Sequence, residues 1–164
     1  MRALKLLLIS VVVIFLILTA FSLLLPSHVR VSRAINITDA PQSITPYIAD
    51  LRKWGQWNKI LADSSITVTS VDSSGIKTNR FDIALLTVEP DSISTSWKQP
   101  NGKEFTGNFS LTTTENVTVV QWYFDFHLRW YPWEKFASII YDDRMGPGME
   151  NSLSQLKGLV ETSH

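Results

Sequence analysis

The chain has 164 residues, with 15 basic and 15 acidic side chains, three histidines and no cysteine. No basic patch or arginine-rich run is present, which argues against a nucleic acid as a partner. The absence of cysteine excludes disulfides, thiolate metal sites and cysteine nucleophiles.

The chain begins with a long apolar segment. No charged residue lies between Leu6 and Leu25, and Pro26 ends the segment. As a helix this segment spans about 30 Å, the thickness of the hydrocarbon core of a bilayer. We therefore predict a membrane anchor at residues 1–26, followed by one domain at residues 27–164.

The flanking charges bear on the orientation of this anchor. Arg2 and Lys5 precede it, as expected for a cytoplasmic N-terminus, and the domain then lies outside the cytoplasm, in a bacterial periplasm or at the cell surface. The alternative is a cleaved signal peptide, which ends in a small-x-small site. Ala20-Phe21-Ser22 is a poor site of this kind, so we prefer a retained single-pass anchor.

The first part of the domain predicts a strand and two helices. Residues 28–38 alternate between apolar and polar side chains, interrupted by Arg33, which is typical of a strand. Asp39-Ala40-Pro41-Gln42 has the form of a helix start, with Asp39 as the cap. Ile44, Ile48 and Leu51 then repeat at helical spacing. Gly55 interrupts this helix, so a second, shorter turn is expected to carry Trp54 and Trp57.

Short strands follow, connected by short turns. We expect them near residues 66–71, 75–79, 81–88, 93–97 and 105–111, with a hairpin turn at Pro100-Asn101-Gly102 and another turn at Thr114-Glu115-Asn116. Connections this short imply an antiparallel meander.

The most regular pattern is the stretch Thr118 to Trp130, which we interpret as one long strand. Its apolar face contains Val120, Trp122, Phe124, Phe126, Leu128 and Trp130. Asp125, His127 and Arg129 belong to the other face. Successive side chains of a strand point to opposite faces, so these polar residues are expected on the outer side of the sheet.

The C-terminal segment predicts two helices. The first begins at Pro132 and continues to about Asp142. Gly146-Pro147-Gly148 is expected to break it, and a last helix follows in which Met149, Leu153, Leu156 and Val160 form an apolar stripe. The sequence thus predicts an α+β domain in which a curved antiparallel sheet of about six to seven strands surrounds a long C-terminal helix.

This order of elements resembles the START/polyketide-cyclase (SRPBCC) superfamily, and within it the membrane-anchored bacterial branch. The resemblance covers residues 28–161. It departs between Asn58 and Arg80, where relatives often have a Trp-rich turn and a glycine-rich hairpin and this chain has only Gly75. The matching residues are Arg33-Ala34-Ile35-Asn36-Ile37, Ala40-Pro41, Asp50, Trp54, Trp57, Met145-Gly146-Pro147-Gly148-Met149-Glu150, Leu153, Leu156 and Leu159.

The resemblance implies a helix-grip fold that encloses an apolar cavity. Members of the superfamily bind lipids, sterols, polyketides or other hydrophobic molecules, and a few cyclise or dehydrate them. The residues that we expect to form the cavity wall are Trp97, Phe105, Gly107, Phe109, Trp122, Phe124, Phe126, Trp130, Phe136, Met149 and Leu153. A stripe of rings is also typical of a plain core, and Gly107 leaves room either for a neighbouring ring or for a ligand.

The sequence predicts no catalytic residue, metal or cofactor. Asp125 and His127 could form an acid–base pair, with Arg129 as an anion clamp. The interpretation that we prefer is a solvated outer face of the sheet. No metal-binding motif accompanies the three histidines, His28, His127 and His164.

We therefore expect a membrane-anchored, non-catalytic domain that binds a hydrophobic small molecule or lipid. An interaction or envelope-stress module whose core is filled by its own rings is the alternative. An enzyme acting on a hydrophobic substrate is a third hypothesis.

Overall fold

The computed structural model describes residues 2–115 and 117–162. Four residues lie outside this range. One is Asn116 of the predicted turn, and the others are Met1 of the predicted anchor and residues 163–164 of the predicted domain. The elements in chain order are α1 (Arg2–Leu24), β1 (His28–Ile37), α2 (Pro41–Ala49), the 3-10 helix η1 (Leu51–Lys53), α3 (Trp54–Trp57), β2 (Val68–Val71), β3 (Gly75–Thr78), β4 (Asp82–Val88), β5 (Ser92–Lys98), β6 (Glu104–Thr114), β7 (Val117–His127), α4 (Pro132–Ser138) and α5 (Tyr141–Thr162).

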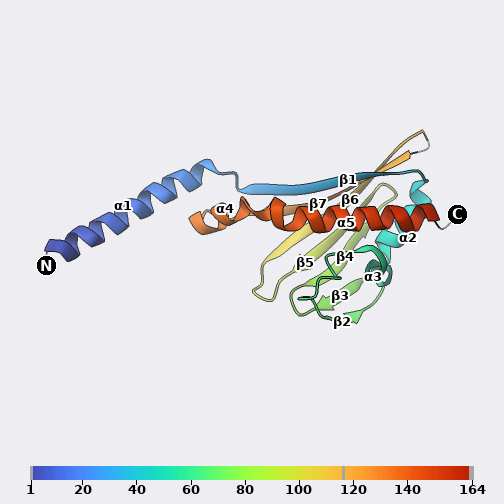
Figure 1. Cartoon of the computed structure of the whole chain (residues 1–164), viewed down its shortest axis with the longest axis horizontal. Helices are drawn as coiled ribbons and strands as arrows, with labels where there is room; N and C mark the ends of the chain where they lie inside the picture. The colour runs from blue at the N-terminus through green and yellow to red at the C-terminus, as the bar shows by residue number, and fades with distance from the viewer. Residues whose placement is uncertain (1, 116, 163–164) are drawn as a thin grey trace.

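The domain is built on a seven-stranded sheet in the order β1-β7-β6-β5-β4-β3-β2. Every neighbouring pair of strands is antiparallel. The sheet curves, and α5 crosses it along β1 (Figure 1). This is the predicted α+β architecture, in which an antiparallel sheet surrounds a long C-terminal helix, and the prediction of fold class is confirmed.

A continuous apolar core joins the sheet to its helices. The predicted stripe of α5, from Met149 to Val160, is buried against the sheet. Trp54 and Trp57 of the short helix α3 are fully buried, and each packs edge-on against the Trp122 ring of β7. The rings of Phe109 and Trp122 stack across β6 and β7 with their centroids 5.0 Å apart. The centre of the fold is therefore filled by the protein's own aromatic side chains.

The long strand is shorter than predicted. It ends at His127, because its partner β1 begins at His28 and the Leu128 N–H makes a last bond to the carbonyl of Ser27, at 2.8 Å. Beyond that point no neighbouring strand holds the chain, and Pro132 starts α4. Trp130 is consequently 60% exposed, so its assignment to the inner face was wrong.

The helix break is also misplaced in the sequence prediction. The chain bends at residues 139–140, and α5 continues through Gly146-Pro147-Gly148. Gly146 lies directly beneath the Arg33 guanidinium group, which makes hydrogen bonds of 2.8 and 3.1 Å to the Asp142 carboxylate. A side chain at Gly146 would collide with that group. The helix continues through Pro147, although the proline removes one backbone hydrogen bond.

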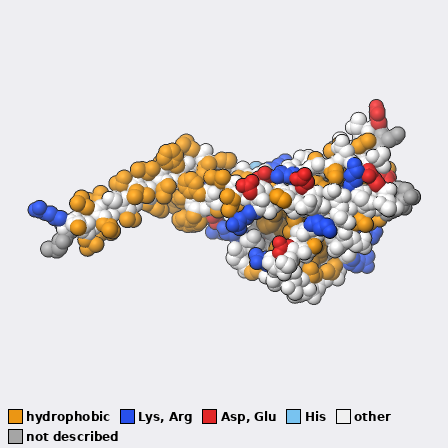
Figure 2. Space-filling model, in the orientation of Figure 1, with side chains coloured by type: hydrophobic (Ala, Val, Ile, Leu, Met, Phe, Trp, Pro, Cys, Tyr) orange, Lys and Arg blue, Asp and Glu red, His pale blue; other side chains and the backbone are white. Residues whose placement is uncertain are grey.

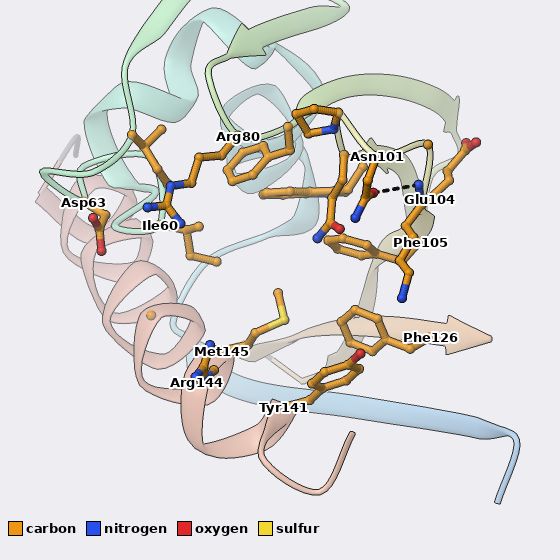
Figure 3. A pocket seen from close by; sticks show the side chains of 18 of the residues that line it. Ile60, Asp63, Arg80, Asn101, Glu104, Phe105, Phe126, Tyr141, Arg144 and Met145 are labelled. Carbon is orange, nitrogen blue, oxygen red and sulfur yellow. Dashed lines mark hydrogen bonds between the residues drawn. The ribbon is translucent and has the colours of Figure 1, made fainter. Parts of the chain in front are cut away.

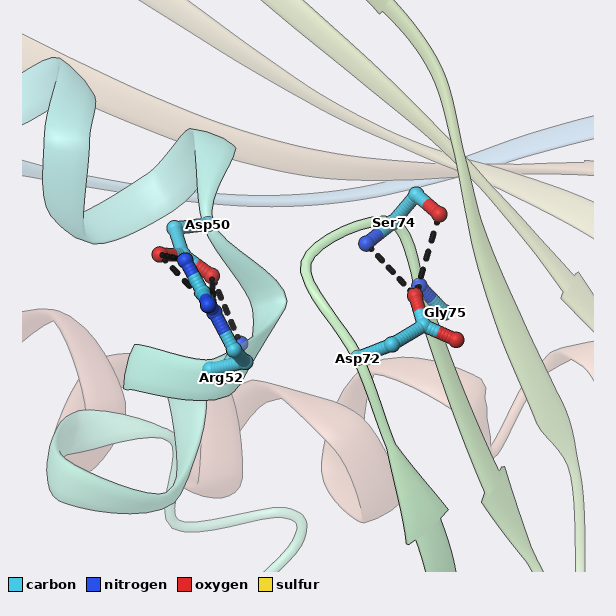
Figure 4. Close-up of polar contacts among 5 residues, drawn as sticks. All are labelled: Asp50, Arg52, Asp72, Ser74 and Gly75. Carbon is cyan, nitrogen blue, oxygen red and sulfur yellow. Dashed lines mark hydrogen bonds and ion pairs between the residues drawn. The ribbon is translucent and has the colours of Figure 1, made fainter.

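Two aspartates fix the segment between α2 and β3 (Figure 4). Asp50 caps η1 through the Arg52 N–H and also binds the Arg52 guanidinium, which lowers the pKa of Asp50. Asp72 accepts bonds from the backbone N–H groups of Ser74 and Gly75, which lowers its pKa and closes the β2–β3 turn. The loop between them, residues 58–67, is bonded near its two ends by Lys59 N–H to Ser152 Oγ and by Thr67 N–H to Asn79 Oδ1. The predicted Asp39 cap is absent, since the N-cap residue of α2 is Ala40 and has no side-chain bond.

Helix α1 projects from the domain, and its side chains are mostly exposed and hydrophobic (Figures 1 and 2). It is long and apolar enough to cross a membrane. It contacts α4 at the end from which β1 starts.

Candidate functional site

An open cavity of about 1030 Å³ lies at one end of the sheet. Figure 3 shows its position between the first turns of α5, the loop after α3 and the β5–β6 hairpin. Ligand pockets typically measure about 300–1,000 Å³, so this cavity is large enough for a sizeable ligand. The residues that line it are Lys59, Ile60, Asp63, Ser65, Ile66, Asn79, Arg80, Phe81, Trp97, Gln99, Pro100, Asn101, Gly102, Lys103, Glu104, Phe105, Phe126, His127, Leu128, Arg129, Glu134, Tyr141, Arg144, Met145 and Gly148.

One wall of the cavity is a continuous row of aromatic rings. Phe81 packs on Trp97 at 4.9 Å, and Trp97 stacks on Phe105 at 6.0 Å. The row continues from Phe105 to Phe126 and from Phe126 to Tyr141, each at 4.8 Å. Strands β5, β6 and β7 supply the middle three rings, and the first turn of α5 supplies the last one.

The opposite wall carries aliphatic side chains and the rim carries charge. Ile60 and Met145 face the rings across the opening (Figure 3). Five of the residues that line the cavity are cationic and three are acidic. The cations are Lys59, Arg80, Lys103, Arg129 and Arg144, and the acids are Asp63, Glu104 and Glu134.

Two of the acids at the rim, Asp63 and Glu134, have a pKa lowered by their neighbours. Glu134 of α4 accepts a bond from the Lys103 ammonium at 2.8 Å and from the Arg129 N–H at 3.1 Å, which together lower the pKa of Glu134. Hydrogen bonds from Ser65 lower the pKa of Asp63, with a smaller contribution from the charge of Arg80. Within the described part of the chain, no ion pair forms to Lys59 or Arg144, and the charge of Arg129 acts on Glu134. The rim thus has a net positive charge with unpaired cations.

The structure separates the predicted wall residues into three groups. Trp97, Phe105 and Phe126 line the cavity. Trp130 and Phe136 lie on the outer surface near α1, 60% and 37% exposed. The others are buried in the closed core and do not line the cavity, namely Gly107, Phe109, Trp122, Phe124, Met149 and Leu153.

Gly107 shows why the core is closed at the centre of the sheet. A Cβ atom at this position would lie 2.7 Å from Cε1 of Phe124 and 2.8 Å from Nε1 of Trp97. The room left by the glycine is therefore occupied by neighbouring rings. The sequence left open whether a neighbouring ring or a ligand occupies this space, and the structure shows neighbouring rings.

The polar residues of β7 are used structurally. Asp125 forms a two-point ion pair with Arg30 of β1, at 2.7 and 2.9 Å, which raises the pKa of Arg30. The His127 ring packs on His28 with a centroid distance of 4.7 Å. Strand parity predicts that His127 and Arg129 lie on the outer face, away from the cavity. Because β7 ends at His127, both residues border the cavity.

Sequence reasoning missed most of the cavity. Ile60, Phe81, Tyr141 and Met145 lie in loops or at the start of α5, where strand parity has no meaning. The rim cations are spread over segments far apart in the chain. The available signal was the departure from the superfamily pattern between Asn58 and Arg80, which is the segment that forms one side of the opening.

The chain matches no protein-family model and no curated protein sequence. Solved structures do resemble it. A START superfamily protein from Mycobacterium smegmatis aligns with 17% identity over 82% of this chain and 99% of its own, with a TM-score of 0.60. Truncated norcoclaurine synthase from Thalictrum flavum aligns with 11% identity over 81% and 93%, with a TM-score of 0.56.

A protein from the dynemicin biosynthetic locus aligns with 17% identity and a TM-score of 0.56. The match covers 82% of this chain but only 48% of that protein. At such identities the likeness defines the fold alone. The chain has the START/polyketide-cyclase-like fold, as the resemblance implied.

Proposed function

We propose that this protein is a membrane-anchored, non-catalytic binding domain for a hydrophobic small molecule or lipid with an acidic group. Residues 1–26, with the span Leu6 to Leu25, form the anchor in this proposal, and residues 27–164 form the binding domain outside the cytoplasm. The observation that carries it is the open cavity with an aromatic wall and a cationic rim.

The cavity wall suits an apolar ligand. Ligand sites are mostly hydrophobic with a few polar groups that orient the ligand. Here five rings, Ile60 and Met145 provide the apolar surface. A chain or ring system that enters between them removes apolar area from water, which contributes about 25 cal/mol per Å².

The rim suits an acidic group on the same ligand. Lys59 and Arg144 lie at the opening without an ion pair among the described residues, and Arg129 lies beside Glu134. Hydrogen bonds between such cations and a carboxylate or phosphate are about twice as strong as neutral ones. The apolar part would therefore lie against the rings, and the acidic group would remain at the opening.

The pKa shifts at the rim argue against two of its acids as general acids. A general acid needs a pKa near the working pH, which usually means a raised carboxyl pKa. Hydrogen bonds lower the pKa of both Asp63 and Glu134 instead. Neither group is therefore tuned as a general acid.

One observation favours the alternative, an interaction module with a self-filled core. The rings around Gly107 leave no space at the centre of the sheet. Under that alternative the cavity at the end of the domain holds only water. The two hypotheses therefore differ in whether a hydrophobic molecule occupies this particular opening.

The test uses a photoreactive fatty acid and the full chain in lipid nanodiscs. After illumination, mass spectrometry locates the labelled peptides. The proposal predicts labelling of residues 141–148 and 99–105 that excess unlabelled fatty acid suppresses. Labelling of α1 reports bulk lipid and is not suppressed. Cavity peptides that stay unlabelled, or are labelled without competition, would contradict the proposal.

A pair of matched variants tests the rim. Arg144→Gln removes a cation that lines the cavity, while Lys77→Gln removes an exposed cation of β3 that does not. Competition by the fatty acid is expected to weaken about tenfold in the first variant, a loss of about 1.4 kcal/mol, and to be unchanged in the second. If the fatty acid competes equally well in both variants, the rim cations do not bind its acidic group.

A further inference from the structure

The segment from Trp130 to Ile140 has its polar and apolar sides reversed relative to a helix in water. Lys135 is buried, with its ammonium group bonded to the carbonyl of Leu25 at 2.8 Å. Glu134 also faces the domain, through Lys103. The large apolar side chains point outward. They are Trp130, Trp133, Phe136, Ile139 and Ile140, which we call the α4 apolar face.

This face is a concentrated patch. Outside α1, the described chain exposes nine large hydrophobic side chains, and five of them belong to the α4 apolar face. Within it Tyr131 stacks on Trp133 with a centroid distance of 4.8 Å, and Trp130 makes a tilted contact with Tyr131 at 4.9 Å. Contiguous apolar patches on a domain mark a site of contact with a partner or a membrane.

Its position in the fold indicates which partner. The bond from Lys135 to Leu25 fixes α4 to the C-terminal end of α1, and α1 contacts α4. Figure 2 shows the hydrophobic surface of α1 continuing onto the adjoining end of the domain. If α1 crosses a bilayer, its last residues lie at the surface of that bilayer, and α4 lies beside them.

The chemistry of the face agrees with this position. Tryptophan and tyrosine are enriched where the hydrocarbon core meets the headgroups, since their rings are apolar with one polar edge. Arg129 precedes the face and Arg144 follows it, and both are exposed. Cations so placed are attracted to anionic headgroups.

We infer that the α4 apolar face inserts into the surface of the bilayer that α1 spans, so that the cavity opens directly at the membrane. Glu134 belongs to α4 and Arg129 lies just before it, and both line the cavity. The opening of the cavity therefore adjoins the inserted face. A lipid-derived ligand could then pass between bilayer and cavity without crossing water. This inference rests on the membrane anchor of the proposed function.

The absence of cysteine allows a direct test with spin labels in the full chain. Four single-cysteine variants are reconstituted into vesicles of phosphatidylcholine and phosphatidylglycerol: Ile139→Cys and Phe136→Cys on the face, Val88→Cys on β4, and Val12→Cys in α1. All four positions are exposed, so a label does not enter the core. The accessibility of each label to oxygen and to a water-soluble nickel chelate reports its depth in the bilayer.

The inference predicts that labels at 136 and 139 have an oxygen-to-nickel ratio several-fold above that at 88 and below that at 12. A ratio at 139 equal to that at 88, with a deep label at 12, would overturn the inference and leave the anchor intact. A shallow label at 12 would instead overturn the anchor. Spin–spin broadening at 139 that grows with the protein-to-lipid ratio would show that a second copy covers the face, and would also overturn the inference.

Discussion

Replacing Gly107 by alanine is expected to destabilise the protein, although alanine usually stabilises a position occupied by glycine. The new Cβ would lie 2.7, 2.8 and 3.0 Å from atoms of Phe124, Trp97 and Thr95. Optimal contact between carbon atoms is about 3.5–4.0 Å. The Phe124 ring is fully buried and the Trp97 ring is 1% exposed, so the new methyl group would displace packed rings.

The magnitude follows from two opposing effects. Overpacking a closed core costs about 1–3 kcal/mol. The smaller conformational freedom of the unfolded alanine chain returns about 0.4–1 kcal/mol. We therefore expect Gly107→Ala to lower the free energy of unfolding by about 1–2 kcal/mol. For a chain of this size that corresponds to a fall in Tm of roughly 2–8 °C.

The assay is thermal unfolding of the detergent-solubilised protein, followed by tryptophan fluorescence. Gly158→Ala is the matched control, because its Cβ would meet no atom within 4 Å and it lies in α5. There alanine should stabilise the protein by about 0.5–1 kcal/mol. If Gly107→Ala is as stable as the control, the space beneath Gly107 is open. That result would contradict the conclusion that the core is closed at the centre of the sheet.

Three further predictions concern the core, α4 and the outer face. Trp122→Ala should lower the free energy of unfolding by about 3–5 kcal/mol, because the ring is fully buried; chemical denaturation measures it, and a loss near zero would contradict the packing. Glu134→Gln should lower Tm at neutral pH, and the two Tm curves should converge as the pH falls. The folded pKa of Glu134 lies below its ordinary value of 4.5, so the stabilisation is complete above that pH and is lost below it. Curves that stay parallel down to pH 3 would refute the assigned pairing with Lys103. His127→Ala should change stability by less than about 0.5 kcal/mol in the same denaturation assay, since this side chain is exposed.

The regular elements could be predicted because their patterns depend on local geometry. The alternation around Trp122 predicts β7 and its inner face, and helical spacing from Met149 predicts the buried side of α5. Burial of one face makes the register of a strand specific, which is why the pairing of β7 with both neighbours agrees with the parity of its side chains.

The errors arose where a distant contact decides the local structure. Alternation continues to Trp130 in the sequence, but the strand ends where its partner β1 ends. Gly146-Pro147-Gly148 reads as a helix break, but Arg33 packs over Gly146 and the helix continues. Neither partner is near in sequence, so no local pattern reveals it.

The cavity was predictable only in outline. Three of the predicted wall residues, Trp97, Phe105 and Phe126, line it. Trp122 and Phe124 do not, because they are buried among other rings at the centre of the sheet. Its remaining wall comes from loops and from the start of α5. The positions of these segments depend on the whole fold.

Native mass spectrometry of the full chain, released from nanodiscs of bacterial lipid, tests the central claim most directly. The account predicts that the protein retains one acidic amphiphile per chain, and that Met145→Trp, which fills the cavity opposite Phe105, loses it. The matched variant Leu86→Trp, at an exposed position of β4, should retain it. A protein that appears without any bound amphiphile, or a Met145→Trp variant that retains it as fully as Leu86→Trp, would contradict the account.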